Sequence, residues 1–271
     1  MLSFIALALL AYALPIECQN LLKHKVNIII LAGQSNMAGR GGVANETSTG
    51  IGTWDGVVPP QCQPNPSIFR LSADLAWVKA REPIHADIDA RKTDGVGPGM
   101  LLPMRQWQKG EFLYEQLVKR AEMAQQSGGV YRAMLWYQGE ADTVNEEDVE
   151  LYKGRLKTFF DNLRSDLHAP LLPIFQVILA SGEGPYIEEV REAQLNIGLP
   201  NVKCVDAKGL PLEPDDLHLT TQAQVRLGEM LADAYLRFKP RSLQSNNVPT
   251  PCSNFVPFFI ITAQFLWIIL T

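Results

Sequence analysis

The sequence predicts one α/β domain in which helices cover both faces of a parallel sheet. Short apolar runs typical of buried strands alternate along the chain with segments of helical periodicity. The chain is also long and apolar enough for a large core, with 271 residues of which 46% are hydrophobic and 20% charged. Strands that alternate with helices pair in parallel, so their carboxyl ends meet at one sheet edge, where α/β enzymes place reactive groups.

The first predicted strand, VNIIILA from Val26, runs directly into the turn GQSNMAG. A buried strand that ends in a tight, glycine-containing turn presents a side chain at the sheet edge, which makes Ser35 a candidate nucleophile. The alternative is that Ser35 only caps the following helix. The local residues leave both interpretations open, so the rest of the chain has to separate them.

The segment after this turn, residues 39–98, is predicted to be largely irregular. It is rich in Gly, Pro, Asn and Asp, and only SIFRL at residues 67–71 suggests a short strand. Long irregular connections inside a compact domain are usually functional. We therefore expect this segment to cover the active edge of the sheet as part of a substrate surface.

Four helices and three further strands follow in alternation. The second helix is capped by Asn145, with acidic residues behind it, and the last begins at Thr221, which forms a capping box with Gln224. The strands begin at Tyr131 (YRAMLWY), Leu171 (LLPIFQVILA) and Asn201 (NVKCVDA). The apolar stripes of the helices are Phe112, Leu113, Leu117, Ala121 and Ala124; Tyr152, Leu156, Phe159, Phe160, Leu163 and Leu167; Ile187, Val190, Gln194 and Ile197; and Val225, Met230, Ala234 and Phe238.

Both ends of the chain are predicted to be targeting segments around a domain at residues 24–240. Residues 1–18 contain a short apolar run followed by small residues, which is typical of a secretory signal peptide, although no Lys or Arg precedes the run. The mature protein is therefore expected to be secreted or held at the cell surface.

The C-terminal end combines a polar spacer, residues 241–254, with an apolar tail, residues 255–271. Small residues, a polar spacer and a terminal apolar tail in this order are typical of a GPI-attachment signal, with residues 245–247 as the acceptor region. A tail-anchoring helix is the alternative, which Pro257 and Gln264 within the tail weaken. Contact with a membrane is expected only through this C-terminal anchor.

Charge and cysteine content bear on partners and cofactors. The net charge is −5 with acidic and basic residues interspersed, which offers no basic stripe for a phosphate backbone, so nucleic acid is not an expected partner. Within the domain, Cys62 and Cys204 can either pair in an oxidising compartment or remain separate thiols. Their spacing shows no metal-binding pattern, and no metal or organic cofactor is expected.

An activated serine requires a base within hydrogen-bond reach and a third group that orients the base. Of the four histidines, His218 lies in EPDDLHLTTQAQ, on a loop between the last strand and the last helix. Asp215 stands three residues before it, so one turn can carry both the imidazole and the carboxylate that fixes its tautomer. Ser35, Asp215 and His218 are therefore the candidate catalytic residues. No such setting surrounds the other histidines, His24, His85 and His168.

Three ordered motifs carry a resemblance to a known family: GQSNMAG at residues 33–39, LWYQGEAD at 135–142 and DDLHLTT at 215–221. From about Val26 to Phe238, the chain resembles the plant carbohydrate esterases of family six in the SGNH hydrolase superfamily, relatives of sialate O-acetylesterases. The resemblance implies a three-layer α/β/α, flavodoxin-like fold. It also implies the removal of acetyl groups from acylated carbohydrate.

The same resemblance assigns roles to single residues. The serine, aspartate and histidine named above are implied to form the catalytic triad. Gln138 is implied to donate to the oxyanion beside the backbone N–H of Ser35, because an amide N–H aimed at the developing alkoxide stabilises it. Asn36 and the glycines after it leave that backbone N–H a clear approach. Glu140 is implied to be an orienting residue, with an ordinary loop carboxylate as the alternative.

Two features depart from the family pattern. Asp216 replaces the glycine of the usual Asp-Gly-Leu-His. In addition, GVGPGM at residues 95–100 runs at once into LLPMRQWQKG, so one helix–strand unit of roughly thirty residues is missing. In the superfamily's strand order 2-1-3-4-5, the absent strand would be the edge strand, so the sheet is expected to close without it.

The missing unit matters for function because, in relatives, it carries the Gly-Gly turn that supplies a backbone oxyanion donor. Three hypotheses follow. The chain is an acetylesterase with weak activity, a catalytically impaired or non-enzymatic carbohydrate-binding relative at the cell surface, or a shortened splice product.

Overall fold

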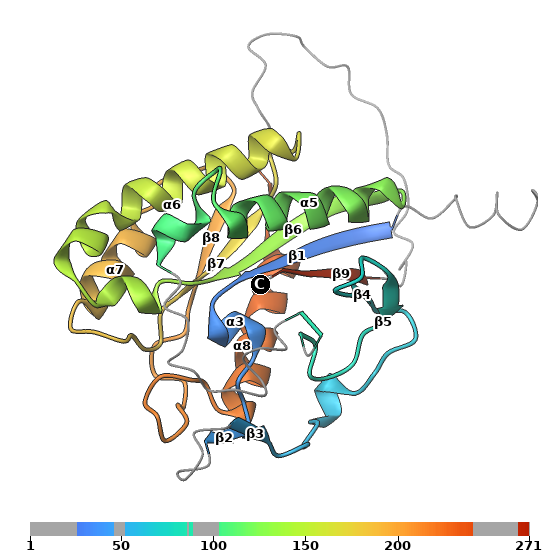
Figure 1. Ribbon diagram of the computed structural model, residues 1–271, viewed down its shortest axis with the longest axis horizontal. Coiled ribbons are helices and arrows are strands. Elements are labelled where there is room, and N and C mark those ends of the chain that lie inside the picture. Colours follow the sequence, from blue (N-terminus) through green and yellow to red (C-terminus); the bar gives the residue numbers. More distant parts are fainter. Residues whose placement is uncertain (1–25, 46–51, 86, 89–102, 241–264, 271) are drawn as a thin grey trace, which may run out of the picture.

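The structure, a computed structural model, describes residues 26–45, 52–85, 87–88, 103–240 and 265–270 (Figure 1). Its middle layer is a seven-stranded sheet in the order β5-β4-β9-β1-β6-β7-β8. Neighbouring strands are parallel except for β4 and β5, which pair antiparallel. The strands are β1 (Val26–Gly33), β4 (Phe69–Leu71), β5 (Trp77–Lys79), β6 (Gly129–Tyr137), β7 (Ile174–Ile178), β8 (Val202–Asp206) and β9 (Phe265–Leu270).

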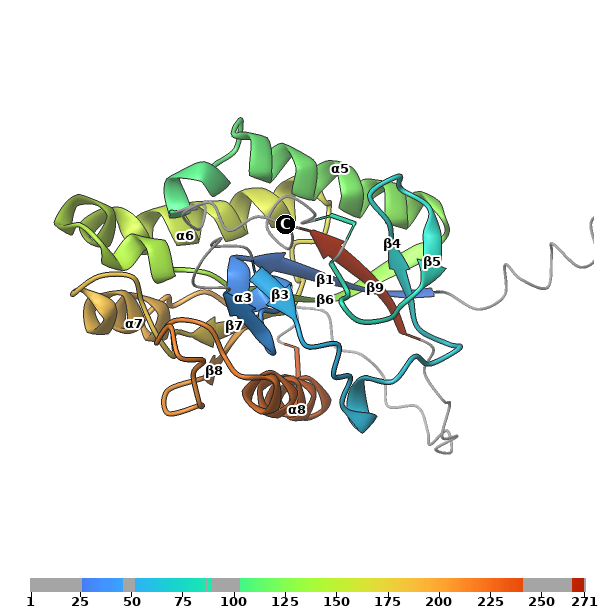
Figure 2. The ribbon, with the colours of Figure 1, turned by 60° about the horizontal axis from the view of Figure 1, so that its bottom comes forward.

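The four strands expected from the sequence are β1, β6, β7 and β8, which lie side by side in parallel as predicted. Helices α5 and α6 cover one face of the sheet and α8 the other, while α7 packs beside α6 (Figure 2). This arrangement confirms the predicted three-layer α/β/α fold. The helices are α3 (Ser35–Ala38), α5 (Phe112–Gln126), α6 (Glu146–Asp166), α7 (Ile187–Leu195) and α8 (Thr221–Arg237), with short 3₁₀ segments η1 (Pro60–Cys62), η2 (Met104–Trp107) and η3 (Glu140–Thr143).

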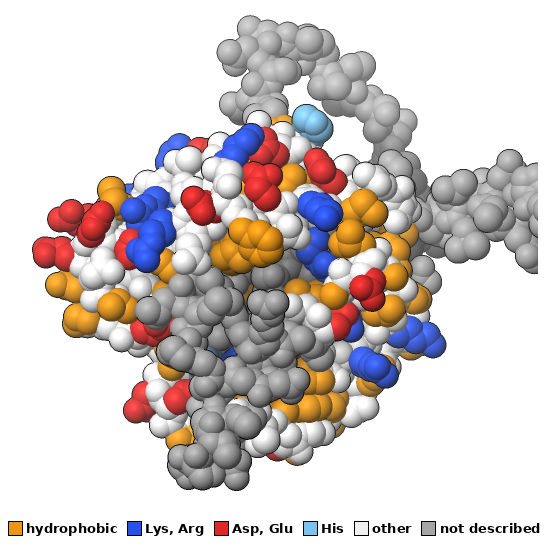
Figure 3. Space-filling view, viewed as in Figure 1, with side chains coloured by type: hydrophobic (Ala, Val, Ile, Leu, Met, Phe, Trp, Pro, Cys, Tyr) orange, Lys and Arg blue, Asp and Glu red, His pale blue; other side chains and the backbone are white. Residues whose placement is uncertain are grey.

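Charged side chains of both signs are interspersed on the face of the molecule shown in Figure 3. Exposed ion pairs on the helices include Lys157–Asp161 at 2.9 Å on α6 and Arg237–Asp233 at 3.3 Å on α8. Exposed pairs of this kind contribute about 0.5 kcal/mol each. The stability of the fold therefore has to come from its interior.

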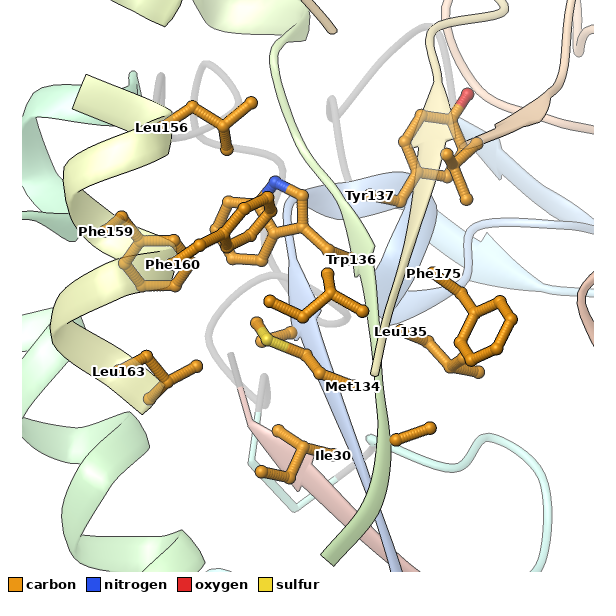
Figure 4. Packing of buried hydrophobic residues seen from close by; sticks show 14 of the residues in the cluster. Ile30, Met134, Leu135, Trp136, Tyr137, Leu156, Phe159, Phe160, Leu163 and Phe175 are labelled. Atoms are coloured by element: carbon orange, nitrogen blue, oxygen red, sulfur yellow. The ribbon is translucent and has the colours of Figure 1, made fainter. Parts of the chain in front are cut away.

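Aromatic side chains fill the interface between β6 and α6 (Figure 4). Trp136 of β6 lies against Phe159 and Phe160 of α6, with ring centroids 4.6 and 6.0 Å apart. All three side chains are fully buried, and burying an aromatic side chain contributes on the order of 2–3 kcal/mol. Trp107 of η2 packs edge-on against Trp136 at 5.0 Å. The same cluster therefore anchors η2 to the core.

Helix capping follows the sequence with one correction. Asn145 caps α6 as predicted, because its side chain accepts a hydrogen bond from the N–H of Asp148 at 2.9 Å. The cap of α8 is Thr220 rather than Thr221. Thr220 has the extended backbone of a cap, and its hydroxyl accepts from the N–H of Ala223 at 3.2 Å.

Two predicted helical stripes differ from the observed buried faces. In α5, Phe112 has 73% of its surface exposed, and Tyr114 is buried in its place. In α8, the predicted positions are only partly buried, because the helix turns a neighbouring row of residues towards the sheet. The buried positions of α8 are Ala223, Leu227 and Leu231. An apolar stripe thus indicates which side of a helix is buried, and packing decides the centre of that side.

The connection between β1 and α5 contains more regular structure than the sequence predicts. SIFRL supplies β4 as expected, but β5 and a separate antiparallel hairpin of β2 (Val43–Asn45) with β3 (Gly52–Trp54) are additional. Residues 46–51, 86 and 89–102 of this connection lie outside the described residues. Its expected place over the active edge stays a prediction.

The position beside β1 is occupied by β9, which comes from the apolar C-terminal tail. The expectation that the sheet closes without a strand there is wrong for this structure, because β9 pairs with β1 on one side and β4 on the other. Residues 1–18, the polar spacer and the rest of the tail lie outside the described residues. In the described ranges, no helix combines the length and apolar character that a membrane crossing needs.

The two cysteines of the domain, Cys62 and Cys204, are separate thiols in this structure, and both are partly buried. Burial raises the pKa of each thiol. Of the two alternatives that the sequence leaves open, the structure therefore shows the unpaired one.

Gly33, at the end of β1, has no room for a side chain. Its φ is 151°, and a Cβ there would lie 2.0 Å from the carbonyl oxygen of Tyr137. We expect Gly33→Ala to lower the free energy of unfolding by about 1–3 kcal/mol, because β1 and β6 would have to move apart.

Gly154→Ala is the matched control, since this exposed position of α6 has no atom within 4 Å of an added Cβ. It should be neutral or stabilise the protein by up to about 1 kcal/mol. Urea unfolding of both variants makes the comparison. If Gly33→Ala and Gly154→Ala unfold at the same urea concentration, β1 and β6 do not approach each other as closely as the structure shows.

Candidate active site

The structure brings the three candidate catalytic side chains together at the carboxyl edge of the sheet. Ser35 is the first residue of α3, and only Gln34 separates it from the end of β1. His218 lies on the loop between β8 and α8, and its Nε2 is 2.9 Å from the Oγ of Ser35. The other ring nitrogen, Nδ1, is 2.6 Å from Oδ2 of Asp215. The sequence prediction that these residues converge is therefore met by the geometry.

The loop that carries the histidine is shaped by Asp215. Its Oδ1 accepts hydrogen bonds from the N–H groups of Leu217 at 3.0 Å and His218 at 2.9 Å, while Oδ2 faces the imidazole. Burial alone would raise the pKa of Asp215, but these bonds outweigh burial and hold the pKa below its usual range. The carboxylate thus stays ionised and fixes the imidazole with its Nδ1 protonated.

Asp216 adopts a left-handed backbone conformation, with a φ of 56°. A glycine reaches this region without steric cost, whereas aspartate is among the few other residues that tolerate it. The glycine of the family pattern and the aspartate of this chain therefore meet the same backbone requirement. The first departure from the pattern leaves the loop geometry intact.

The serine turn is held against the end of β6. The N–H of Gln34 donates to the carbonyl of Tyr137 at 2.9 Å, and the carbonyl of Gln34 accepts from Met37 and Ala38, both at 2.9 Å. The first N–H groups of a helix have no partner within the helix. In the described part of the chain, no acceptor is bonded to the N–H of Ser35. This N–H is available to a negatively charged oxygen beside the Ser35 hydroxyl.

Gln138 is fully buried at the end of β6, where its side chain joins a polar network. Its Nε2 donates to Oε1 of Gln34 at 3.0 Å and to Oδ2 of Asp142, and the N–H of Gly139 donates to the same Gln34 oxygen at 2.9 Å. An amide nitrogen carries two hydrogens, so both are engaged. Gln138 can donate to an oxyanion only by exchanging one of these bonds. Its predicted role as an oxyanion donor stays a prediction.

Asn36 joins the serine turn to the histidine loop. Its Nδ2 donates to the carbonyl of Leu217 at 3.2 Å, and its Oδ1 accepts from the N–H of Leu219 at 2.9 Å. These two residues flank His218 on either side. Since Asn36 is also the neighbour of Ser35, its side chain sets the distance between the hydroxyl and the imidazole.

Two buried carboxyl groups lie behind this turn. Glu140 accepts from Nδ2 of Asn36 at 3.0 Å, and burial raises the pKa of Glu140 to about 7 even though that bond acts in the opposite direction. Burial also raises the pKa of Asp142 to about 7, although the N–H of Met104 donates to both carboxylate oxygens, at 2.8 and 2.9 Å. Glu140 is therefore a buried structural partner of Asn36 rather than an ordinary loop carboxylate.

Several supporting residues were missed from sequence. Gln34 and Asp142 lie inside the motifs GQSNMAG and LWYQGEAD, so their place in a motif was the available signal. His85 has its Nδ1 2.9 Å from the carbonyl of Ala38, and burial lowers the pKa of His85 to about 3, which keeps it neutral. Gln224 was predicted to complete a capping box, but it donates to a carbonyl of α3 at 3.1 Å. Only tertiary contacts reveal these last two roles.

The chemistry that the arrangement supports is nucleophilic attack by a hydroxyl. Imidazole within hydrogen-bond reach of a serine can accept its proton, and a carboxylate on the far nitrogen stabilises the imidazolium. Among the described residues, no group of three or more His, Cys, Asp or Glu side chains is placed to hold a metal ion.

A known family matches most of the chain. The family described as "Carbohydrate esterase, sialic acid-specific acetylesterase" matches residues 25–104 and 102–237. The two matched pieces meet at residues 102–104, close to the point where the sequence is expected to lack a helix–strand unit. Both end before the apolar tail, so β9 lies outside the matched residues.

Individual proteins that resemble this chain also include carbohydrate esterases. A protein of Arabidopsis thaliana named "Probable carbohydrate esterase At4g34215" is 51% identical in an alignment of 234 residues, which covers 77% of this chain and 90% of the relative. The crystal structure of the Arabidopsis protein with this designation matches at 49% identity with a TM-score of 0.73, over 79% of this chain and 98% of that one. The crystal structure of NanS matches at 15% identity with a TM-score of 0.56, over 79% and 97% of the two chains, which shows a shared fold.

The left-handed backbone at residue 216 predicts a specific order of stability. Asp216→Gly should change the free energy of unfolding by less than about 1 kcal/mol, because relief of the backbone conformation and the greater freedom of the unfolded chain act in opposite directions. Asp216→Val should destabilise by about 1–2 kcal/mol, since a β-branched residue is strained at this φ. Urea unfolding of the two variants measures this difference. If the valine variant is as stable as the glycine variant, residue 216 does not have the left-handed backbone conformation described above.

The buried Glu140 predicts a pH-dependent stability. A carboxyl group with a raised pKa in the folded state contributes stability that is fully present below its unfolded pKa and is lost as the pH rises through the folded pKa. Relative to Glu140→Gln, the unmodified protein should therefore lose stability as the pH rises from about 4.5 to about 7, by up to about 3 kcal/mol at about 1.4 kcal/mol per pKa unit.

Urea unfolding at pH 4.5, 6 and 8 makes this measurement. Glu150→Gln, at an exposed carboxylate of α6, is the control for the loss of one charge. If the difference between the Glu140→Gln variant and the parent stays constant across this range, Glu140 does not ionise in the buried position that the structure gives it.

Proposed function

The chain belongs to the family of carbohydrate esterases described as sialic acid-specific acetylesterases, and we propose that it removes acetyl groups from carbohydrate hydroxyls by attack of Ser35. The observation that carries the proposal is the line of hydrogen bonds from Ser35 through His218 to Asp215. A serine activated by an imidazole that is itself oriented by a carboxylate is the arrangement of serine esterases.

In the proposed reaction, the Oγ of Ser35 attacks the carbonyl carbon of the acetyl ester while Nε2 of His218 takes the hydroxyl proton. The tetrahedral intermediate collapses as the imidazolium returns this proton to the leaving sugar oxygen, which leaves an acetyl-enzyme. A water molecule then repeats the two steps, so that acetate leaves and the serine hydroxyl is restored. Asp215 stabilises the imidazolium in both halves of the reaction.

Stabilisation of the oxyanion is the weak point of this site. The N–H of Ser35 is one available donor, and Gln138 is a second donor if it exchanges a hydrogen bond within its network. The Gly-Gly turn that supplies a further donor in relatives belongs to the missing unit. Because loss of one oxyanion donor lowers turnover by on the order of a hundred- to a thousand-fold, we expect weak activity.

The competing hypothesis is a carbohydrate-binding relative that retains the triad residues but has lost catalysis. The engagement of both Gln138 hydrogens, together with the missing unit, favours this alternative. The break in the family match at residues 102–104 is also what a shortened splice product would give. Hydrolysis that depends on Ser35 separates the enzyme from the binding protein.

An extracellular location is part of the proposal. It rests on the signal-peptide pattern of residues 1–18 and on the acetylated polysaccharides that a carbohydrate esterase would meet outside the cell. The polar spacer and apolar tail suggest a GPI anchor as the form of surface retention. This anchor requires cleavage of the apolar tail, so it is the alternative to a mature protein that keeps β9.

The activity test uses hydrolysis of a small aryl acetate. We expect slow but measurable turnover that Ser35→Ala abolishes and that Asp215→Asn lowers by on the order of a thousand- to ten-thousand-fold, because the imidazole loses the group that fixes its tautomer. Ser165→Ala, at an exposed serine of α6, is the control and should retain full activity. Equal rates for folded Ser35→Ala and parent protein would exclude the esterase and favour the binding protein.

A further inference from the structure

The edge of β1 that faces away from β6 is occupied by the C-terminal segment of the same chain. We propose that this edge is a strand-binding site and that Phe265–Leu270 is its permanent occupant, retained in the mature protein as a replacement for the strand that the missing unit would supply. The inference concerns how the domain is completed and does not depend on the proposed esterase activity.

The pairing of β9 is extensive for so short a strand. Six consecutive residues pair in parallel with β1, from Asn27↔Phe265 to Ala32↔Leu270. On its other side, β9 pairs in parallel with β4 through Phe69↔Leu266 and Arg70↔Trp267. A strand with neighbours on both sides is an interior strand of the sheet rather than an added edge.

The rest of the sheet depends on this interior position. In the observed strand order, β4 and β5 connect to the other described strands only through β9. Figure 2 shows β9 between β1 and the β4–β5 pair, and α5 approaches both β9 and β1. Without β9, the backbone groups along one side of β1 would lose their partners beneath α5, and unpaired backbone groups are costly where water cannot reach them.

The sequence of β9 suits this position. FLWIIL contains only apolar residues, two of them β-branched and two aromatic, with neither Gly nor Pro. Parallel strands buried on both faces have such near-continuous apolar sequences, whereas edge strands usually carry charges or proline. If these six residues belonged to a cleaved anchor signal, they would have to be apolar but would need no preference for β-structure.

The chain can deliver this strand to its own sheet. Residues 241–264 separate the end of the described domain from β9, and an extended segment of this length reaches up to about 80 Å. A domain of this size is about 45 Å across, so the segment can pass from one side of the sheet to the other. The tail of the same molecule can therefore occupy this edge of β1.

The consequence concerns the end of β1, where the serine turn begins. The pairing with β9 continues to Ala32, three residues before Ser35, so the C-terminal strand supports the element that presents the hydroxyl. Cleavage within residues 245–247, as a GPI signal requires, would remove β9 from the sheet. Retention of the strand and cleavage of the tail are therefore mutually exclusive.

Hydrogen exchange on the full chain, followed by mass spectrometry, tests the proposal. We expect the amides of β9 to be protected together with those of β1. Ile268→Pro removes an N–H in the middle of β9 and should raise exchange in both β1 and β4 by about a hundred-fold. Ile268→Val keeps a β-branched residue and should leave both strands protected. Exchange of the β9 amides at the rate of an unstructured peptide would overturn the proposal.

A second measurement does not require that the proline variant folds. The intact mass of the protein purified from plant cells should include the residues of β9. A mature protein whose mass shows that the chain ends near residue 246 would overturn the proposal and support the GPI signal instead.

Discussion

Gly33 approaches the carbonyl of Tyr137 so closely that no side chain fits between the ends of β1 and β6. This contact lets the N–H of Gln34 reach the same carbonyl at 2.9 Å and turns the chain so that the next residue, Ser35, opens a short helix at the sheet edge. The position of the Ser35 hydroxyl, the candidate nucleophile, is thus set by backbone pairing between two neighbouring strands. The other residues of the site are positioned relative to the Ser35 turn.

Two buried polar links hold the remaining parts of the site to this point. Asn36 connects the serine turn to the histidine loop and to Glu140, and Gln34 connects it to Gln138 and from there to Asp142. Buried polar groups are costly unless they are hydrogen-bonded, and networks that satisfy them specify one geometry. Burial raises the pKa of Glu140 and of Asp142 because their hydrogen bonds only partly offset the loss of hydration.

The shortening expected near residue 100 has different consequences for the fold and for the proposed catalysis. The hydrophobic core between β6 and α6 is complete, because Trp107 re-enters it directly after the junction. The sheet keeps a strand beside β1, because the C-terminal segment pairs there. If the Gly-Gly turn of relatives is absent as the sequence predicts, we expect the loss to fall on oxyanion stabilisation rather than on stability of the domain.

The sequence by itself determined the alternation of strands and helices, and with it the parallel order of β1, β6, β7 and β8. It also predicted that Ser35, Asp215 and His218 lie close together, because side chains that follow parallel strands meet at one edge of the sheet whatever the details of packing. Capping was predictable where the cap is a local contact, as at Asn145. These features depend on residues close together in the chain or on the general geometry of parallel sheets.

Tertiary structure alone decided the features that depend on contacts between distant segments. One hydrogen of the Gln138 amide is directed to Gln34, 104 positions away in the chain, which no local pattern reveals. The apolar tail resembles a targeting signal in sequence, yet six of its residues form a strand, because apolarity suits a bilayer and a buried sheet equally well. The pairing of these residues with β1, a strand far away in the chain, is what distinguishes the two outcomes.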